Sequence, residues 1–266
     1  MATTIGVISI KGGVGKTTVT TNLGAVIASK FDKKVLVVDA NFSAPNVGLH
    51  LGIVEPEKTL NDVMNDKCSI FDAIIHMDDY DVLPSSLLTK RVSPFKLKQK
   101  LSYLKNVYDY IVVDSSPNLN DEMLATMLAS DQLLVVTSPD YPTLSCTMHA
   151  TKVAKQKNVP ILGLVVNKVR GKSFEVPVSD IEDATGVPVL AVIGDDIKVL
   201  EALSHSIPAT MYAPRKDFTN EYSELAAAMI GADYPTSKKL SAVLKKLMGK
   251  KNRAAENRKL LRAGKL

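Results

Sequence analysis

The stretch Lys11-Gly12-Gly13-Val14-Gly15-Lys16-Thr17-Thr18 determines how this chain begins to fold. It follows an apolar run, residues 5–10, and precedes residues 19–28, whose apolar side chains recur at helical spacing. This order predicts a strand, a glycine-rich turn and a helix. Glycines let successive backbone N–H groups point at one anion, and a helix N-terminus adds partial positive charge there. We therefore expect the stretch to hold ATP, with Lys16 at the β- and γ-phosphates and the Thr17 hydroxyl on Mg²⁺.

Two carboxylates follow other predicted strands. Asp39 follows the apolar residues 35–38, and Asp114 follows residues 111–113. A carboxylate at the carboxyl end of a strand, facing the loop, can hold Mg²⁺ directly or through water. We therefore expect Asp39 and Asp114 to bind the metal together with Thr17.

The composition favours one α/β domain in a reducing compartment. The chain has 266 residues, of which 45% are hydrophobic, and no run of 18 apolar residues that would span a membrane. The start of the chain lacks the charged-then-apolar pattern of a secretion leader. Cys68 and Cys146 are far apart and belong to no CxxC pair, which is typical of buried thiols in the cytoplasm.

Apolar runs alternate with helical patterns along the chain. The expected strands are Thr4–Ile10, Lys34–Asp39, Tyr80–Leu83, Tyr108–Asp114, Gln132–Thr137, Ile161–Asn167 and Val189–Ile193. The expected helices are Lys16–Lys30, Thr59–Asn65, Pro94–Leu104, Asp121–Ala129, Leu144–Gln156, Val178–Thr185, Ile197–Ser204 and Asn220–Ile230. Several strands are continuous apolar runs, as strands covered on both faces are. The pattern predicts a doubly wound α/β fold: a mostly parallel sheet with helices on both faces.

The net charge of +5 divides unevenly between the body and the tail. Residues 236–266 carry 11 of the 33 basic side chains and one of the 28 acidic ones, which leaves 22 basic and 27 acidic side chains on the body. We place the ATPase domain at residues 1–232, and a linker with a basic C-terminal tail at residues 233–266. A basic tail on an acidic body predicts a polyanionic partner, either a membrane or a nucleic acid.

The glycine-rich stretch resembles the deviant Walker A motif of the MinD/ParA family of dimerising P-loop ATPases. An ordinary phosphate loop has a glycine where Ile10 stands, whereas here a second lysine, Lys11, leads the loop. The resemblance implies a homodimer that forms on ATP binding, in which Lys11 reaches the partner's nucleotide and neutralises phosphate charge. An arginine finger acts in a comparable way in other ATPases and GTPases.

The two strand-end segments resemble the switch regions of the same family, with two departures. The second acid of switch I, which orients or activates the attacking water, falls on Asn41. An asparagine amide can orient a water but cannot take its proton, so we expect ATP hydrolysis to be slow. The glycine after the switch II proline is replaced by Asn118, a residue type that tolerates a left-handed backbone.

The adenine end of the site carries weaker signals. Asn167 ends a strand, and its amide has the donors and the acceptor that suit a purine edge. The resemblance implies that Asn167 contacts adenine, and that residues 193–202 and 207–208 form the adenine-flanking loop and the following helix. Gly194 stands where the family has proline.

The tail contains an amphipathic helical pattern. One face carries Leu240, Val243, Leu244, Leu247 and Met248, and lysines that include Lys245 and Lys246 occupy the remainder. An apolar stripe edged with lysines suits an anionic membrane surface, and two copies in a dimer would bind with avidity. Two alternatives remain: the helix docks on its own core or on a partner protein, or the tail binds DNA with the help of Lys251, Arg253, Arg258, Lys259, Arg262 and Lys265.

Together these features predict a cytoplasmic MinD/ParA-like ATPase that is peripheral at the inner face of the cell membrane. The expected output is spatial positioning of a division site or another polar assembly, with an unidentified activating or cargo protein as a further partner. The alternatives are a partition ATPase on DNA and a nucleotide-gated scaffold that barely hydrolyses ATP. An iron–sulfur carrier related to the nitrogenase iron protein is a third, which the missing cysteine pair argues against.

Overall fold

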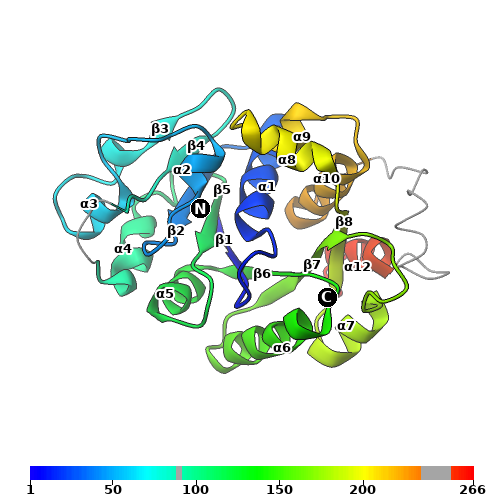
Figure 1. The fold of residues 1–266 in the computed structure, drawn as a ribbon. Coiled ribbons are helices and arrows are strands. Elements are labelled where there is room, and N and C mark those ends of the chain that lie inside the picture. The colour runs from blue at the N-terminus through cyan, green and yellow to red at the C-terminus, as the bar shows by residue number, and fades with distance from the viewer. Residues whose placement is uncertain (88–91, 235–252) are drawn as a thin grey trace.

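The computed structural model describes residues 1–87, 92–234 and 253–266 (Figure 1). In these residues one eight-stranded sheet has the order β3-β4-β2-β5-β1-β6-β7-β8. Neighbouring strands are parallel except for β3 and β4, which are antiparallel. The strands are β1 (Thr3–Ile8), β2 (Val35–Ala40), β3 (Ile75–His76), β4 (Asp81–Leu83), β5 (Tyr110–Ser115), β6 (Gln132–Thr137), β7 (Ile161–Val169) and β8 (Val189–Gly194).

Helices cover both faces of the sheet (Figure 1). One face carries α1 (Lys16–Phe31), α2 (Val47–His50), α8 (Ile197–Ser204), α9 (Ala209–Tyr212) and α10 (Asp217–Ile230). The other carries α3 (Leu60–Met64), α4 (Leu97–Ser102), α5 (Asp121–Ala129), α6 (Tyr141–Gln156) and α7 (Val178–Thr185). The predicted fold class, a doubly wound and mostly parallel sheet, is therefore confirmed.

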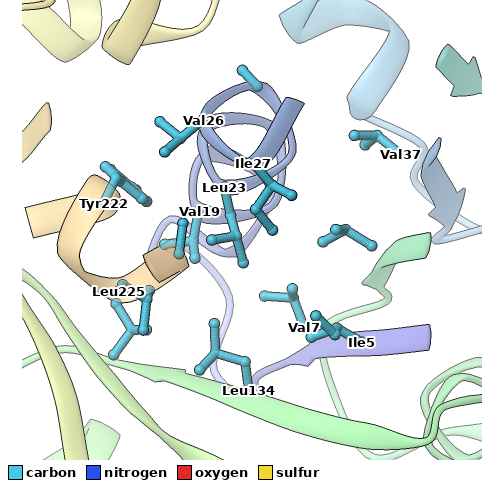
Figure 2. Close-up of a cluster of buried hydrophobic side chains, with 14 of the residues drawn as sticks. Ile5, Val7, Val19, Leu23, Val26, Ile27, Val37, Leu134, Tyr222 and Leu225 are labelled. Atoms are coloured by element: carbon cyan, nitrogen blue, oxygen red, sulfur yellow. The ribbon is translucent and has the colours of Figure 1, made fainter. Parts of the chain in front are cut away.

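The alternation of side chains along each strand divides the core into two layers. Ile5 and Val7 of β1 point into the layer under α1 and α10, whereas Ile8 points into the opposite layer. Figure 2 shows Leu23 and Ile27 of α1 above β1. All of these side chains are at most 1% exposed. The strands are buried on both faces, which explains their continuous apolar sequences.

Three short elements were not predicted from the sequence, and one predicted helix begins earlier than expected. β3, α2 and α9 have two to four residues each, too few for a periodic pattern. Helix α6 begins at Tyr141, three residues before the expected start. Its cap is the Asp140 carboxylate, which accepts the Thr143 N–H at 2.9 Å.

The last described helix, α12 (Arg253–Arg262), packs on the body of the molecule, against β8 and α10 (Figure 1). The residues on which the membrane prediction depends, 240–248, lie outside the described residues. Among the residues that are described, no helix is both long and apolar enough to cross a membrane.

Candidate functional site

The glycine-rich loop lies between β1 and α1, at the carboxyl ends of the central strands. Gly13 and Gly15 have φ values of 81° and 90°, which favour glycine. Gly15 is the N-cap of α1 and has no side-chain oxygen to offer to the N–H groups of the first turn. Those N–H groups and the helix dipole therefore remain available to an anion in front of the helix.

The end of β7 holds this loop in place. Asn167 Nδ2 donates to the Val14 carbonyl at 2.8 Å, and Lys168 Nζ donates to the Gly13 carbonyl at 2.7 Å. A Cβ atom at Gly15 would lie 2.3 Å from Asn167 Nδ2, so a larger residue at Gly15 would displace Asn167. Asn167, which the sequence places at the adenine, ties the phosphate loop to the sheet in this structure.

The four residues expected at the metal and the phosphates lie together. Asp39 and Asp114 are register neighbours on β2 and β5, and both are 0% exposed. Lys16 Nζ lies 2.8 Å from Asp114 Oδ1, and the Thr17 hydroxyl donates to Asp114 Oδ2 at 2.6 Å. The Thr20 hydroxyl, which the sequence did not single out, donates to Asp114 Oδ1 at 3.3 Å.

The charge balance of this cluster favours a further cation. Burial, and next the neighbouring Asp114, raise the pKa of Asp39 to about 7, although N–H groups of Val47 and Asn41 and the charge of Lys16 oppose the shift. Two buried carboxylates thus share one lysine. The Thr17 hydroxyl commits its hydrogen to Asp114, so its oxygen lone pairs remain for a metal. These oxygens fit Mg²⁺.

Asp39 also organises the loop that follows β2. Its Oδ2 accepts the N–H groups of Asn46 and Val47, both at 2.9 Å, and its Oδ1 accepts the Asn41 N–H at 3.1 Å. Asn41 Nδ2 donates to the Ala44 carbonyl. In the described residues, the buried Asn41 Oδ1 has no hydrogen-bond partner. A water molecule could satisfy this orphaned acceptor.

The loops that follow β2 and β5 are each bonded to a neighbouring part of the molecule. The Ser43 hydroxyl donates to Glu122 Oε2 at 2.9 Å, which links the loop after β2 to α5. Asn118 has a φ of 69°, so it adopts the left-handed backbone that its glycine counterpart would adopt. The Asn118 N–H donates to the Ile10 carbonyl at 3.0 Å and joins this loop to the start of the phosphate loop.

Lys11 is exposed at the start of the phosphate loop. No described residue is a hydrogen-bond or ion-pair partner of its ammonium group. Burial raises the pKa of the Asp140 carboxyl, and hydrogen bonds from Ser138 and Thr143 lower it. The positive charge of Lys11 lowers the same pKa by a smaller amount. The Lys11 side chain is therefore available to contact a group outside the chain.

A cavity of about 400 Å³ extends from the phosphate loop towards α8. Gly15 and Thr18 line its polar end together with Asn167. The apolar end is lined by Ile193, Val199, Leu200, Pro208 and Tyr222. A polar end at a helix N-terminus and an apolar end of this size suit the phosphates and the base of one nucleotide.

Some cavity residues were not predicted. His50, at the end of α2, lines the cavity, as do Asn22 of α1 and Tyr222 of α10. Burial lowers the pKa of His50, so its imidazole is neutral at pH 7. No spacing or motif marks these three residues, because only the packing of α2, α1 and α10 brings them to one cavity.

The chain is similar to known proteins over most of its length. The model of a family described as an AAA domain matches residues 2–159. An uncharacterised ATP-binding protein of Methanocaldococcus jannaschii is 32% identical over 94% of this chain and 98% of its own. A septum site-determining protein MinD of Synechocystis is 26% identical over 86% of this chain and 90% of its own.

Solved structures agree with the sequence relatives. The cell division ATPase MinD of Pyrococcus furiosus superimposes with a TM-score of 0.81 and is 33% identical, covering 85% of this chain and 97% of its own. The MinD of Pyrococcus horikoshii, solved with Mg-ADP, has a TM-score of 0.82 and 31% identity, covering 86% of this chain and 96% of its own. By its sequence, its fold and its lysine-led phosphate loop, the chain belongs to the MinD/ParA family of P-loop ATPases.

Proposed function

We propose that this protein is a MinD-like switch that binds Mg-ATP, dimerises, and hydrolyses ATP slowly. The observation that carries the proposal is the cluster of Lys16, Thr17, Asp39 and Asp114 at the start of α1. It adjoins the glycine-rich loop, whose Gly15 lines a cavity of about 400 Å³. The Mg-ADP of the Pyrococcus horikoshii relative supports the same ligand class.

Each residue of the cluster has a distinct role in this proposal. The N–H groups of residues 12–18 would hold the phosphates, and Lys16 would bridge the β- and γ-phosphates. Thr17 would bind Mg²⁺ directly, with Asp39 and Asp114 acting directly or through water. Bound Mg²⁺ would offset part of the negative charge of the phosphates and of the two carboxylates. Asn167 and the apolar end of the cavity would receive adenine.

The proposal is tested by sedimentation with ADP, ATP and a non-hydrolysable ATP analogue in the presence of Mg²⁺. We expect a monomer with ADP and a dimer with ATP or the analogue. A protein that stays monomeric when it is saturated with the analogue would contradict the dimer. A protein that binds none of the three nucleotides would contradict the proposal as a whole.

Asn41 explains why hydrolysis should be slow, and changing it should alter the rate. Asn41→Asp supplies a carboxylate where Asn41 Oδ1 now lies, so a general base becomes available. A general base contributes about 10²–10⁴-fold to the rate of a reaction. The new carboxylate lies close to Asp39, whose negative charge opposes a second one, so we expect the lower figure of at least about tenfold faster turnover. Single-turnover ATP hydrolysis measures the effect.

Asn41→Ala is the matched control for that experiment. It removes the amide that we expect to orient the attacking water, so its turnover should fall below that of the parent protein. If both variants hydrolyse ATP at the parental rate, Asn41 has no role in the chemical step. A parent protein that turns over many ATP molecules each minute without a partner would contradict slow hydrolysis.

We further propose that the ATP-bound dimer docks on an anionic membrane through residues 240–248. The support comes from the sequence pattern of Leu240, Val243, Leu244, Leu247 and Met248 with its flanking lysines. Each lysine near an anionic surface contributes about 1 kcal/mol to the free energy of membrane binding. One short helix therefore binds weakly, whereas the two helices of a dimer bind with avidity. The protein would then be cytoplasmic and peripheral at the inner face of the membrane, positioning a division site or another polar assembly with an activating partner.

Replacing Leu244 and Leu247 by glutamate should abolish ATP-dependent flotation with anionic liposomes. Burying a leucine stabilises an apolar contact by about 1.5–3 kcal/mol, so losing two of them should weaken binding by at least about 100-fold. This pair is preferable to deleting residues 237–266, because the deletion would also remove α12 from β8.

Leu260→Glu makes the same chemical change at a leucine of α12 that is 40% exposed, and it should leave flotation unchanged. Unchanged flotation of the Leu244/Leu247 double variant would contradict the membrane proposal. A DNA mobility shift measured across a salt series, in the same proteins, tests the partition-type alternative. Two of the basic residues that this alternative would use, Arg253 and Arg258, are already paired with glutamates.

A further inference from the structure

Helix α12 is built into the fold, although its sequence is mostly polar. Ala254 is 0% exposed and packs in the same core cluster as Val189 and Val192 of β8. Leu261 packs against the cluster that contains Tyr222 of α10. Figure 1 shows the helix beside β8 and close to α10, at the end of the sheet.

Side chains of α12 and α7 bond the backbone of β8, which is an edge strand. The Val189 N–H donates to Glu182 Oε1 at 2.8 Å, and the Val189 carbonyl accepts Asn257 Nδ2 at 2.9 Å. Asn257 Nδ2 also donates to Glu182 Oε1 at 2.6 Å, and Arg253 pairs with Glu182 Oε2 at 3.0 Å. Unpaired backbone N–H and C=O groups on an edge strand can pair with another chain. Here Glu182 and Asn257 bond both backbone groups of Val189.

Arg258 connects β8 to α10. Its NH1 group donates to the Leu190 carbonyl and to Glu221 Oε2, both at 2.7 Å, and its NH2 group pairs with Glu224. Arg258 is 1% exposed, and the two glutamates are also buried. The planar guanidinium fork can make these bonds at once, which the point charge of a lysine cannot.

The two elements that Arg258 joins are walls of the nucleotide cavity. Tyr222 lines the cavity and lies on α10 between Glu221 and Glu224. Ile193 and Gly194 also line it, and they follow Leu190 on β8. These walls also pack directly on each other, and Arg258 adds a polar link between them although it does not itself line the cavity.

We propose that Arg258 is a positioning residue of the nucleotide site, and that the docking of α12 and the binding of the base stabilise each other. The proposal rests on the proposed function, because it requires a nucleotide in this cavity. If docked α12 raises the affinity for ATP by some factor, thermodynamic linkage requires ATP to favour docking by the same factor. The phosphate loop is held by β7 and not by α12, so the phosphates alone should show no such coupling.

The first test compares ATP with inorganic tripolyphosphate, which has no base. In the full chain, Arg258→Met should lower the affinity for Mg-ATP by about fivefold or more and leave that for Mg-tripolyphosphate unchanged. Arg258→Lys should recover part of the loss. Lys259→Met removes a charge from the exposed face of the same helix and should change neither affinity.

An equal loss for both ligands would overturn the proposal, because it would show general destabilisation. So would an unchanged affinity for ATP. If the parent protein binds neither ligand, the proposed function fails, and this outcome is distinct from a failure of the α12 coupling.

The second test needs no variant and is hydrogen exchange of residues 254–262 in the full chain. Mg-ATP should slow exchange of these amides by about fivefold or more, and Mg-tripolyphosphate should not. Exchange in α12 that is independent of ATP would overturn the proposal even if the variants fail to fold.

Discussion

Lys16→Ala is expected to remove ATP binding and to destabilise the protein at the same time. Two charge-assisted bonds to phosphates, worth about 1.5–3 kcal/mol each, correspond to a loss of two to four orders of magnitude in affinity. Lys16 also pairs with Asp114, which is 0% exposed, at 2.8 Å. Breaking a buried pair by removing one partner costs about 3–5 kcal/mol. Isothermal titration with Mg-ATP and urea unfolding measure the two effects separately.

The destabilisation has a specific signature. Lys16 pairs with Asp114 and also acts on the charge of Asp39, so without it the two buried carboxylates lose their nearby positive charge. Millimolar Mg²⁺ should therefore stabilise Lys16→Ala more than it stabilises the parent protein. The control is Lys168→Ala, which removes a lysine of β7 that donates to the Gly13 carbonyl of the loop but does not change the Lys16–Asp114 pair. Parental ATP affinity in Lys16→Ala would contradict the assignment of the phosphate site.

The parts of the site that could be predicted are those with a local cause. A glycine-rich turn between a strand and a helix requires particular backbone angles, and Gly13 and Gly15 have them. Asp39 and Asp114 could be placed together because each ends a strand, and the ends of parallel strands share one edge of the sheet. Continuous apolar strands likewise predicted a sheet covered on both faces, which the structure confirms.

The parts that could not be predicted depend on contacts between distant segments. Tyr222 lies more than 200 positions after the phosphate loop, and nothing nearby in the sequence marks it as a cavity residue. Arg258 and Lys259 are adjacent in a basic stretch, and their composition suggests two solvated charges. One is buried between β8 and α10 and the other is exposed, because helical geometry points them in different directions.

Lys11→Ala is expected to abolish ATP-dependent dimerisation without harming the monomer. The Lys11 side chain is exposed, and the structure describes no hydrogen bond or ion pair for it, so stability should change by less than about 0.5 kcal/mol. Its binding of Mg-ATP as a monomer should also stay within a few-fold of the parental value, because Lys16 and Thr17 remain. Sedimentation with the non-hydrolysable analogue should then show a monomer where the parent protein shows a dimer.

The size of this effect follows from where the charge would act. In the proposed dimer, two ATP molecules bring eight negative phosphate charges near one interface. Bound Mg²⁺ and Lys16 of the same subunit would offset part of this charge, and Lys11 of the opposite subunit would offset more of it across the interface. Lys33→Ala is the matched control. Lys33 is also exposed, but it precedes β2 and so lies at the amino ends of the strands, away from the phosphate loop. If Lys11→Ala dimerises with ATP as readily as Lys33→Ala does, Lys11 does not complete the partner's site, and the lysine at the head of the loop needs another explanation.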